Sequence, residues 1–129
     1  YYSSGFSKET KVTMTDGRQK QISNLHIDDE TTGGKVTGII QMFNDSPTFY
    51  LPETAGICSG NNIIQTNQWD IASNLDLQPC ETVPILYHIT TESGEIQIGD
   101  TIVRDFEETN DDNINDNIDL FVRKNIEYM

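Results

Sequence analysis

Positive charge is scarce in this chain of 129 residues. Lys and Arg total 8 against 21 Asp and Glu, so the formal net charge is −13. Such a field repels phosphate and disfavours an anionic lipid surface, which argues against nucleic-acid and membrane binding. No apolar run approaches the roughly 20 residues that span a bilayer, and the start shows no signal-peptide core. Because the first residue is Tyr1 rather than Met, we expect an internal or processed piece of a longer polypeptide.

Cysteine is almost absent too. Cys58 and Cys80 can form at most one disulfide, which excludes a disulfide-stapled scaffold. The sequence alone does not decide whether they pair, because pairing depends on geometry. Free cysteine is among the most buried residue types, so a small buried thiol is the expectation for each. A cysteine nucleophile with a partner is the alternative.

Histidine is equally rare, and the spacing of His26 and His88 does not suit a zinc site. Two acidic runs, Asp28–Glu30 and Asp111–Asp119, could supply oxygen ligands to calcium. Neither has the Asp-x-Asp-x-Asp-Gly pattern with a trailing Glu, so both are expected to be solvated acidic surface. We therefore predict neither a metal nor another cofactor.

Hydrophobic residues make up only 35% of the chain, yet they recur in short patterned runs. Lys11–Thr15 alternates, Asp16–Gly17 favours a two-residue type I′ turn, and Arg18–Ile22 returns as the second strand of a hairpin. Many short strands at close spacing are typical of an all-β domain. The further predicted strands are Lys35–Phe43, Thr48–Leu51, Ile57–Ile64 with an interruption at Ser59–Asn62, Gln68–Ile71, Pro84–Thr90, Glu95–Ile98 and Thr101–Phe106.

The last stretch has a different periodicity. Between Asn110 and Met129 the spacings of three and four predict one apolar stripe on a helix. The stripe consists of Ile114, Ile118, Phe121, Val122 and Ile126. Residues 105–129 also hold eight acids against two bases. We expect an amphipathic helix that packs on the β body or docks on a neighbour.

The opening of the chain resembles that of the Hint (Hedgehog/intein) family of autoprocessing domains. Members have a Phe or Leu after the first residue, a Thr-x-Val strand, an Asp-Gly hairpin, a Lys-x-Ile pair and a Leu-x-x-Gly-Asp turn. The matching segments here are Phe6, Thr10–Val12, Asp16–Gly17, Lys20–Ile22 and Leu25–Asp29. Asp28 stands where the last turn of the family has Gly.

Later segments extend the resemblance over roughly residues 5 to 107. Cys58–Ile64, followed by Gln68–Trp69, resembles the Thr-x-x-His block and the Trp strand of the family. Leu86–Ile89, Gly94–Ile96 and Ile102–Phe106 resemble its closing strands. The resemblance therefore implies the Hint fold for the β body and leaves the tail outside it.

The resemblance also implies site positions. In the family the first residue, Cys or Ser, attacks the preceding carbonyl, and the block histidine assists departure of the amide. Splicing members then cyclise a terminal Asn preceded by His. The nucleophile position is Gly5 here, the Thr position is Ser59 and the His position is Asn62. Arg104–Asp105 stand for the terminal pair, and His88 replaces the acid that often follows the Tyr of the penultimate strand.

The resemblance therefore implies that the groups needed for self-processing are missing from this chain. Gly5 has no side chain to attack, Asn62 cannot transfer a proton near neutral pH, and Asp105 lacks an amide to cyclise. His88 could be a relocated general base near Ser59, although a strand histidine satisfied by a neighbour is the simpler expectation. Trp69, with Phe49–Tyr50, could form a ligand platform, but packing is expected.

We therefore predict an inactive, Hint-like horseshoe of short strands at residues 6–107, with a linker at 1–5 and an acidic C-terminal helix at 108–129. Its role would be structural or docking within a larger polypeptide. The partners would be the flanking segments of that polypeptide, with a possible protein partner at residues 110–129. Two alternatives stay open: an active domain that cleaves near Gly5–Phe6 or Asp105, and a ligand- or metal-binding β domain unrelated to Hint.

Overall fold

The computed structural model describes residues 4–66 and 68–106, and nearly all of their regular structure is strand. The strands are β1 (Lys11–Thr13), β2 (Gln19–Gln21), β3 (Glu30–Thr31), β4 (Gly34–Phe43), β5 (Thr48–Tyr50), β6 (Ile57–Ser59), β7 (Ile63–Gln65), β8 (Trp69–Ile71), β9 (Pro79–Cys80), β10 (Ile85–Thr91), β11 (Glu95–Ile98) and β12 (Thr101–Arg104). Single-turn 3-10 segments occupy Ile22–Asn24 (η1), Pro52–Thr54 (η2) and Ala72–Asn74 (η3). The predicted all-β fold is confirmed.

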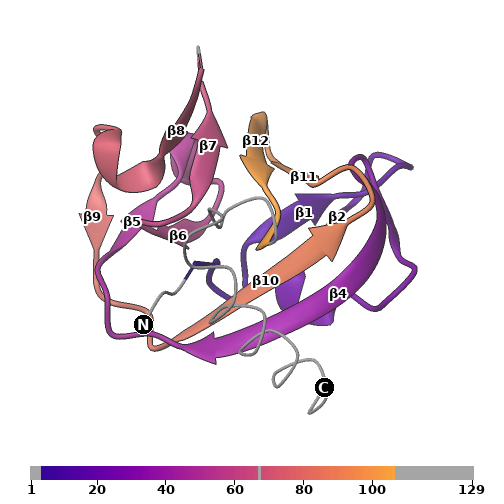
Figure 1. Ribbon diagram of the computed structural model, residues 1–129, viewed down its shortest axis with the longest axis horizontal. Helices are drawn as coiled ribbons and strands as arrows, with labels where there is room; N and C mark the ends of the chain where they lie inside the picture. The colour runs from indigo at the N-terminus through magenta and orange to yellow at the C-terminus, as the bar shows by residue number, and fades with distance from the viewer. Residues whose placement is uncertain (1–3, 67, 107–129) are drawn as a thin grey trace, which may run out of the picture.

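These strands form four small antiparallel sheets. Their strand orders are β1-β2, β10-β4-β3, β11-β12-β7-β8 and β6-β5-β9. In Figure 1 the long β4–β10 ribbon runs along one side, with the β5, β6 and β9 strands near one end and the β1–β2 hairpin near the other. No helix among the described residues is both long and apolar enough to cross a membrane. The predicted helix at 108–129 lies outside the described residues.

The first hairpin forms as predicted, but its turn is of another kind. Thr13 pairs with Gln19, and the Gly17 N–H donates to the Met14 carbonyl at 3.0 Å. Gly17 has a φ of 86°, whereas Asp16 is not among the residues with positive φ. A type I′ turn needs positive φ at both central residues, so the predicted turn type was wrong. The loop between Met14 and Arg18 has one residue more than a two-residue turn. Gly17 is its residue with a left-handed backbone conformation.

Burial along β4 follows the strand alternation. Val36, Gly38, Ile40 and Met42 are buried, and the residues that alternate with them are exposed or half-buried. Successive side chains point to opposite faces of a strand, so one row of β4 enters the core. Two short strands, β3 and β9, and the three 3-10 turns were not predicted, because segments of two or three residues carry no measurable periodicity.

Two hydrophobic clusters hold the sheets together. The larger includes Phe6, Val12, Ile22, Leu25, Val36, Leu51, Cys58, Ile64, Ala72, Ile89, Ile96, Ile98 and Val103. The smaller consists of Ile40, Met42, Leu86 and Phe106, with Val83 packed against it. The larger cluster draws on every sheet, so it joins the small sheets into one body.

Candidate functional site

The segment around Gly5 lies between two sheets. Phe6 forms bridges with Cys58 of β6 and with Tyr87 of β10. The Phe6 N–H donates to the Tyr87 carbonyl and the Tyr87 N–H donates to the Phe6 carbonyl, both at 2.8 Å. On the other side the Ser59 N–H donates to the Gly5 carbonyl at 3.1 Å. Residues 5 and 6 therefore act as a short strand that is paired on both edges, and Ser4 and Gly5 are buried within the fold.

Ser59 and Asn62 both bind the Gly5 backbone. The Gly5 N–H donates to Ser59 Oγ at 3.2 Å. The Asn62 side-chain amide donates to the Gly5 carbonyl at 2.8 Å, and its nitrogen also lies 3.0 Å from Ser59 O and Ser59 Oγ. The turn that joins β6 to β7 positions both side chains, since the Asn62 N–H approaches the Ser59 carbonyl at 3.4 Å. The structure thus brings together three of the site residues predicted from the sequence: Gly5, Ser59 and Asn62.

This arrangement binds a peptide unit but offers no proton transfer. The Asn62 nitrogen faces three oxygens, so it must be the NH₂ end of the amide, which donates and does not ionise. Asn62 Oδ1 is buried without a hydrogen-bond partner among the described residues. Ser59 Oγ accepts the Gly5 N–H, and a serine hydroxyl is too weak an acid to protonate a departing amide nitrogen near neutral pH. Ser59 and Asn62 therefore hold the Gly5 backbone in place through hydrogen bonds.

The space beside Gly5 is closed. A Cβ on Gly5 would lie 2.9 Å from Leu86 Cβ and 2.9 Å from the Tyr87 carbonyl oxygen. The Tyr87 carbonyl is itself paired with Phe6 N–H, so it cannot move away without breaking that bond. Any residue other than glycine would therefore overpack this position.

His88 is enclosed by aromatic rings. Its ring lies edge-on to Phe6 at 5.0 Å between centroids and to Phe106 at 5.6 Å. Nδ1 accepts the Ile89 N–H at 3.0 Å, and Nε2 is buried with no hydrogen-bond partner among the described residues. Burial lowers the pKa of His88 from 6.5 to about 3, because the charged imidazolium would lose its hydration. His88 is thus neutral at physiological pH and is part of the packing, and a neighbour satisfies Nδ1 but not Nε2.

Asp105 makes hydrogen bonds with the turn that follows β10. Its Oδ2 accepts the Thr91 N–H at 2.8 Å, and its own N–H donates to the Gly94 carbonyl at 2.9 Å. Asp105 is buried, and its neighbour Phe106 is the residue that contacts His88. The preceding Arg104 lies over the Trp69 ring at 4.1 Å and 3.6 Å from Glu95. The Asp105 carboxylate therefore caps the turn at the end of β10.

The cysteines lie on either side of β5. Cys58 is fully buried opposite Phe49, and burial raises the pKa of its thiol to about 12. Cys80 is half-buried, and its sulfur lies 3.2 Å from Thr48 Oγ1. Both thiols are free. A thiolate is the reactive form of cysteine, so Cys58 is inert in the folded chain.

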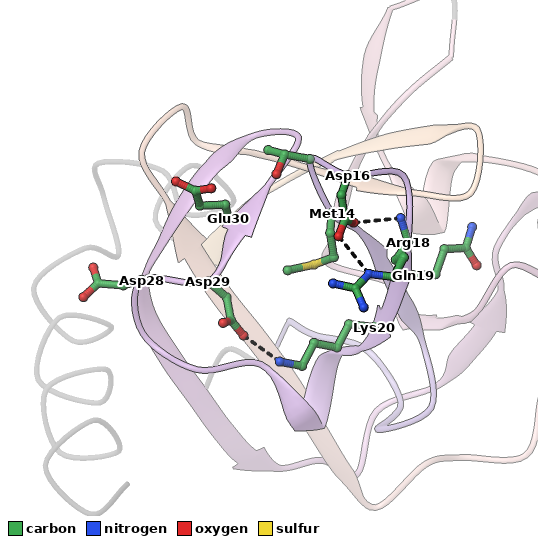
Figure 2. A pocket seen from close by; sticks show the side chains of 9 residues that line it. Met14, Asp16, Arg18, Gln19, Lys20, Asp28, Asp29 and Glu30 are labelled. Carbon is green, nitrogen blue, oxygen red and sulfur yellow. Dashed lines mark hydrogen bonds and ion pairs between the residues drawn. The ribbon is translucent and has the colours of Figure 1, made fainter.

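A polar pocket of about 530 Å³ lies beside the first hairpin (Figure 2). All three residues of the acidic run Asp28–Glu30, which was predicted to be solvated surface, line this pocket. Within it Arg18 Nε pairs with Asp16 at 2.8 Å and Lys20 Nζ pairs with Asp29 at 3.0 Å. The His26 N–H, then Lys20, lower the pKa of the Asp29 carboxyl. Asp29 is thus already engaged in closing its own turn.

The fold has a known counterpart. No family model matches the chain, and no curated protein matches it. Among solved structures, the chain is similar to the crystal structure of the gp41-1 intein, with a TM-score of 0.60 and 14% sequence identity. The match covers 81% of this chain and 100% of that chain. The fold is intein-like, as the resemblance to Hint implied, and this argues against a β domain of unrelated architecture.

Several residues around Gly5 were not predicted from the sequence. Leu86 and Tyr87 close the space beside Gly5, and Ser4 is buried with its hydroxyl unpartnered among the described residues. The ring of Phe106 completes the enclosure of His88. Leu86 and Tyr87 follow Gly5 by more than 80 positions, and only strand pairing brings them to it. The available signal was Gly5, which the resemblance to Hint places at the nucleophile position.

Proposed function

We propose that this chain is a Hint-like module of a larger polypeptide that does not sever or splice its host and serves a structural or docking role. The observation that carries this proposal is the closed space beside Gly5, where a Cβ would meet Leu86 Cβ and the Tyr87 carbonyl at 2.9 Å. Glycine brings no nucleophile, and its surroundings leave no room for one.

The chemistry of the neighbouring groups supports the same proposal. An acyl shift needs a side-chain nucleophile after the reacting carbonyl and a proton for the leaving nitrogen. The Gly5 N–H instead donates a hydrogen bond to Ser59 Oγ, and Asn62 contributes a neutral amide. Terminal cyclisation needs an amide nitrogen, and Asp105 supplies a carboxylate that is bonded to Thr91. Each step of self-processing therefore lacks its reacting group.

A structural role fits the way in which the two ends of the described body meet. Phe6 follows the first described residues, and Phe106 is the last of them; both contact the ring of His88. The chain therefore enters the β body at Phe6 and leaves it at Phe106 at neighbouring points. The acidic residues 108–129 would offer a partner protein a surface that favours basic groups.

The test places the chain between two stable reporter domains and follows its intact mass during long incubation with and without a thiol. We expect one species of full mass. Discrete fragments from a break on either side of Gly5 or after Asp105 would refute the proposal.

The matched control is the double variant Gly5→Cys/Asn62→His, which puts a nucleophile and a proton-transferring group at the two family positions. This variant is also expected to stay intact, because the Cβ at position 5 has no room. If the control is cleaved and the natural chain is not, the natural chain is inactive because it lacks the reacting side chains. The lack of space beside Gly5 would then not be the cause of its inactivity.

A further inference from the structure

The strand β4 is paired along only part of its outer edge, which is the side that faces away from β10. On this side β3 pairs with it at Gly34 and Lys35, and the turn before β3 bonds the N–H and the carbonyl of Val36 at 2.9 Å. Along residues 38–43 the described part of the chain places no strand on this side. In Figure 1 β4 lies on the outer side of the β4–β10 ribbon.

The backbone of this edge has hydrogen-bonding groups that the described residues leave unused. The N–H and the carbonyl of Tyr87 are both bonded to Phe6, so Tyr87 does not bond Gln41, which lies opposite it in β4. Residues that point toward a partner strand and away from it alternate in an antiparallel pair. The N–H and carbonyl groups of Ile39, Gln41 and Phe43 therefore point away from β10.

The edge also lacks the features that keep exposed strands from pairing with other chains. Charged side chains, proline or very short length usually protect such edges. Among the other edge strands, β8 contains Asp70, β9 begins with Pro79 and β11 begins with Glu95. Residues 36–43 contain neither a charged residue nor a proline, and Phe43 is 81% exposed. This edge is thus open to a further strand.

We propose that a second copy of the chain pairs its own β4 with this edge, antiparallel and about a two-fold axis at Gln41. In this register Gln41 lies opposite Gln41, and Ile39 lies opposite Phe43 of the other copy. The outward N–H and carbonyl groups of the two copies then bond one another. A two-fold interface must be self-complementary, and this register is. It also gives the exposed ring of Phe43 an apolar side chain to pack against.

The charge of the chain sets how strong this dimer can be. Each copy has a net charge of −13, so two copies repel each other, although the paired residues themselves are uncharged. About five residues per copy take part, fewer than the roughly 20–30 a side of a standard interface, so the dimer should be weak. Raising the ionic strength from about 0.01 M to 0.15 M should tighten it, because salt screens the repulsion.

The test combines sedimentation equilibrium of the full chain over a range of concentrations with amide hydrogen exchange. We expect a monomer–dimer equilibrium with a dissociation constant between about 1 μM and 1 mM. The amides of Ile39, Gln41 and Phe43 should exchange rapidly in dilute solution and at least about tenfold more slowly where the dimer predominates. The amides of Ile40 and Met42, which point toward β10, should exchange slowly at both concentrations.

Gln41→Pro should abolish the dimer and leave the fold intact, because the N–H that it removes points away from β10. Gln41→Ala is the matched control, since it keeps this N–H and should dimerise as the natural chain does. Thermal unfolding shows whether the proline variant folds. Phe43→Lys changes an exposed side chain and gives a second test, with an expected loss of about tenfold or more in dimer affinity.

Three outcomes would overturn the proposal. A chain that stays monomeric at about 1 mM would leave the edge to a strand of another protein. A dimer that survives both Gln41→Pro and Phe43→Lys would use a different surface. Slow exchange of the Ile39 and Gln41 amides at every concentration would show that this edge is covered within a single copy.

Discussion

Gly5 shows how the lack of a side chain at one position can be required for packing. Its N–H and carbonyl are both bonded, to Ser59 Oγ and to the Asn62 amide, and its missing Cβ is what lets Leu86 and Tyr87 approach. A buried peptide unit with its hydrogen bonds made is stable, and an added methyl group would push these bonds apart.

Gly5→Ala should therefore destabilise the fold by about 1–3 kcal/mol, the usual cost of overpacking a filled site. Denaturant unfolding measures this loss. Gly60→Ala is the matched control, because its new Cβ would meet Ser73 Cβ at 3.2 Å and the Phe49 ring at 3.4 Å, contacts that side chains can relax. Equal losses for the two variants would contradict the closed space at Gly5.

His88 makes stability depend on pH in a definite direction. Its pKa falls from 6.5 to about 3 on folding, so below pH 6.5 the unfolded chain binds a proton that the folded chain does not. The free energy of unfolding should thus decrease as pH falls from about 6.5 toward 3, by at most about 1.4 kcal/mol per unit.

Unfolding curves between pH 7.5 and 5.5 test this, since ordinary carboxyl groups stay ionised over most of that range. His88→Gln should flatten the slope. Ile89→Val, a neighbouring core change, should lower stability equally at each pH and leave the slope as it is. A slope that survives His88→Gln would have to come from another group.

At the scale of elements, the backbone of the turn before β3 is strained at Asp28. Asp28 has a φ of 74°, in the left-handed region that favours glycine. The resemblance to Hint places it where the turn of that family has Gly. The turn is closed by Asp28 N–H on the Val36 carbonyl at 2.9 Å and by Asp29 on the His26 N–H. These bonds hold the residue in a conformation that its side chain opposes.

Asp28→Gly should consequently stabilise the protein, by up to about 1 kcal/mol, because it removes the cost of a left-handed side chain. The melting temperature reports the change. Glu30→Gly, two residues on and within β3, should have the opposite sign, since glycine weakens a strand. If both variants lower the melting temperature, the strain at Asp28 is not what limits the turn.

At the scale of the whole molecule, the short strand at residues 5 and 6 joins two parts of the fold that are distant in the sequence. Phe6 bridges β6 and β10, and Ser7 N–H donates to the Ile57 carbonyl at 3.0 Å. Phe6 is also a fully buried member of the larger cluster. Removing this strand would expose two sheet edges and open the core together.

Deletion of residues 1–7 should abolish the cooperative unfolding transition, whereas deletion of residues 1–3 should leave it nearly unchanged. Calorimetry distinguishes the two. A chain lacking residues 1–7 that still unfolds in one sharp transition would show that the β6 and β10 sheets hold together without their connecting strand.

Local chemistry made much of the fold predictable. Short apolar runs located β4 and β10, and Asp16–Gly17 located the first hairpin. The resemblance to Hint placed Gly5, Ser59 and Asn62 in one site, and their hydrogen bonds confirm that proximity. The turn type at Asp16–Gly17 was wrong, because the dipeptide tolerates two turns and the length of the loop chooses between them.

The sequence by itself determined the all-β body, the acidity of the chain and the absence of a side chain at Gly5, because composition, alternation and the identity of a single side chain are local properties. Only the tertiary structure decided that the space beside Gly5 is closed, that His88 is neutral between Phe6 and Phe106, and that Asp105 binds Thr91. Each of these depends on atoms from strands far apart in the chain, and their meeting is set by sheet pairing and burial, which no local pattern encodes.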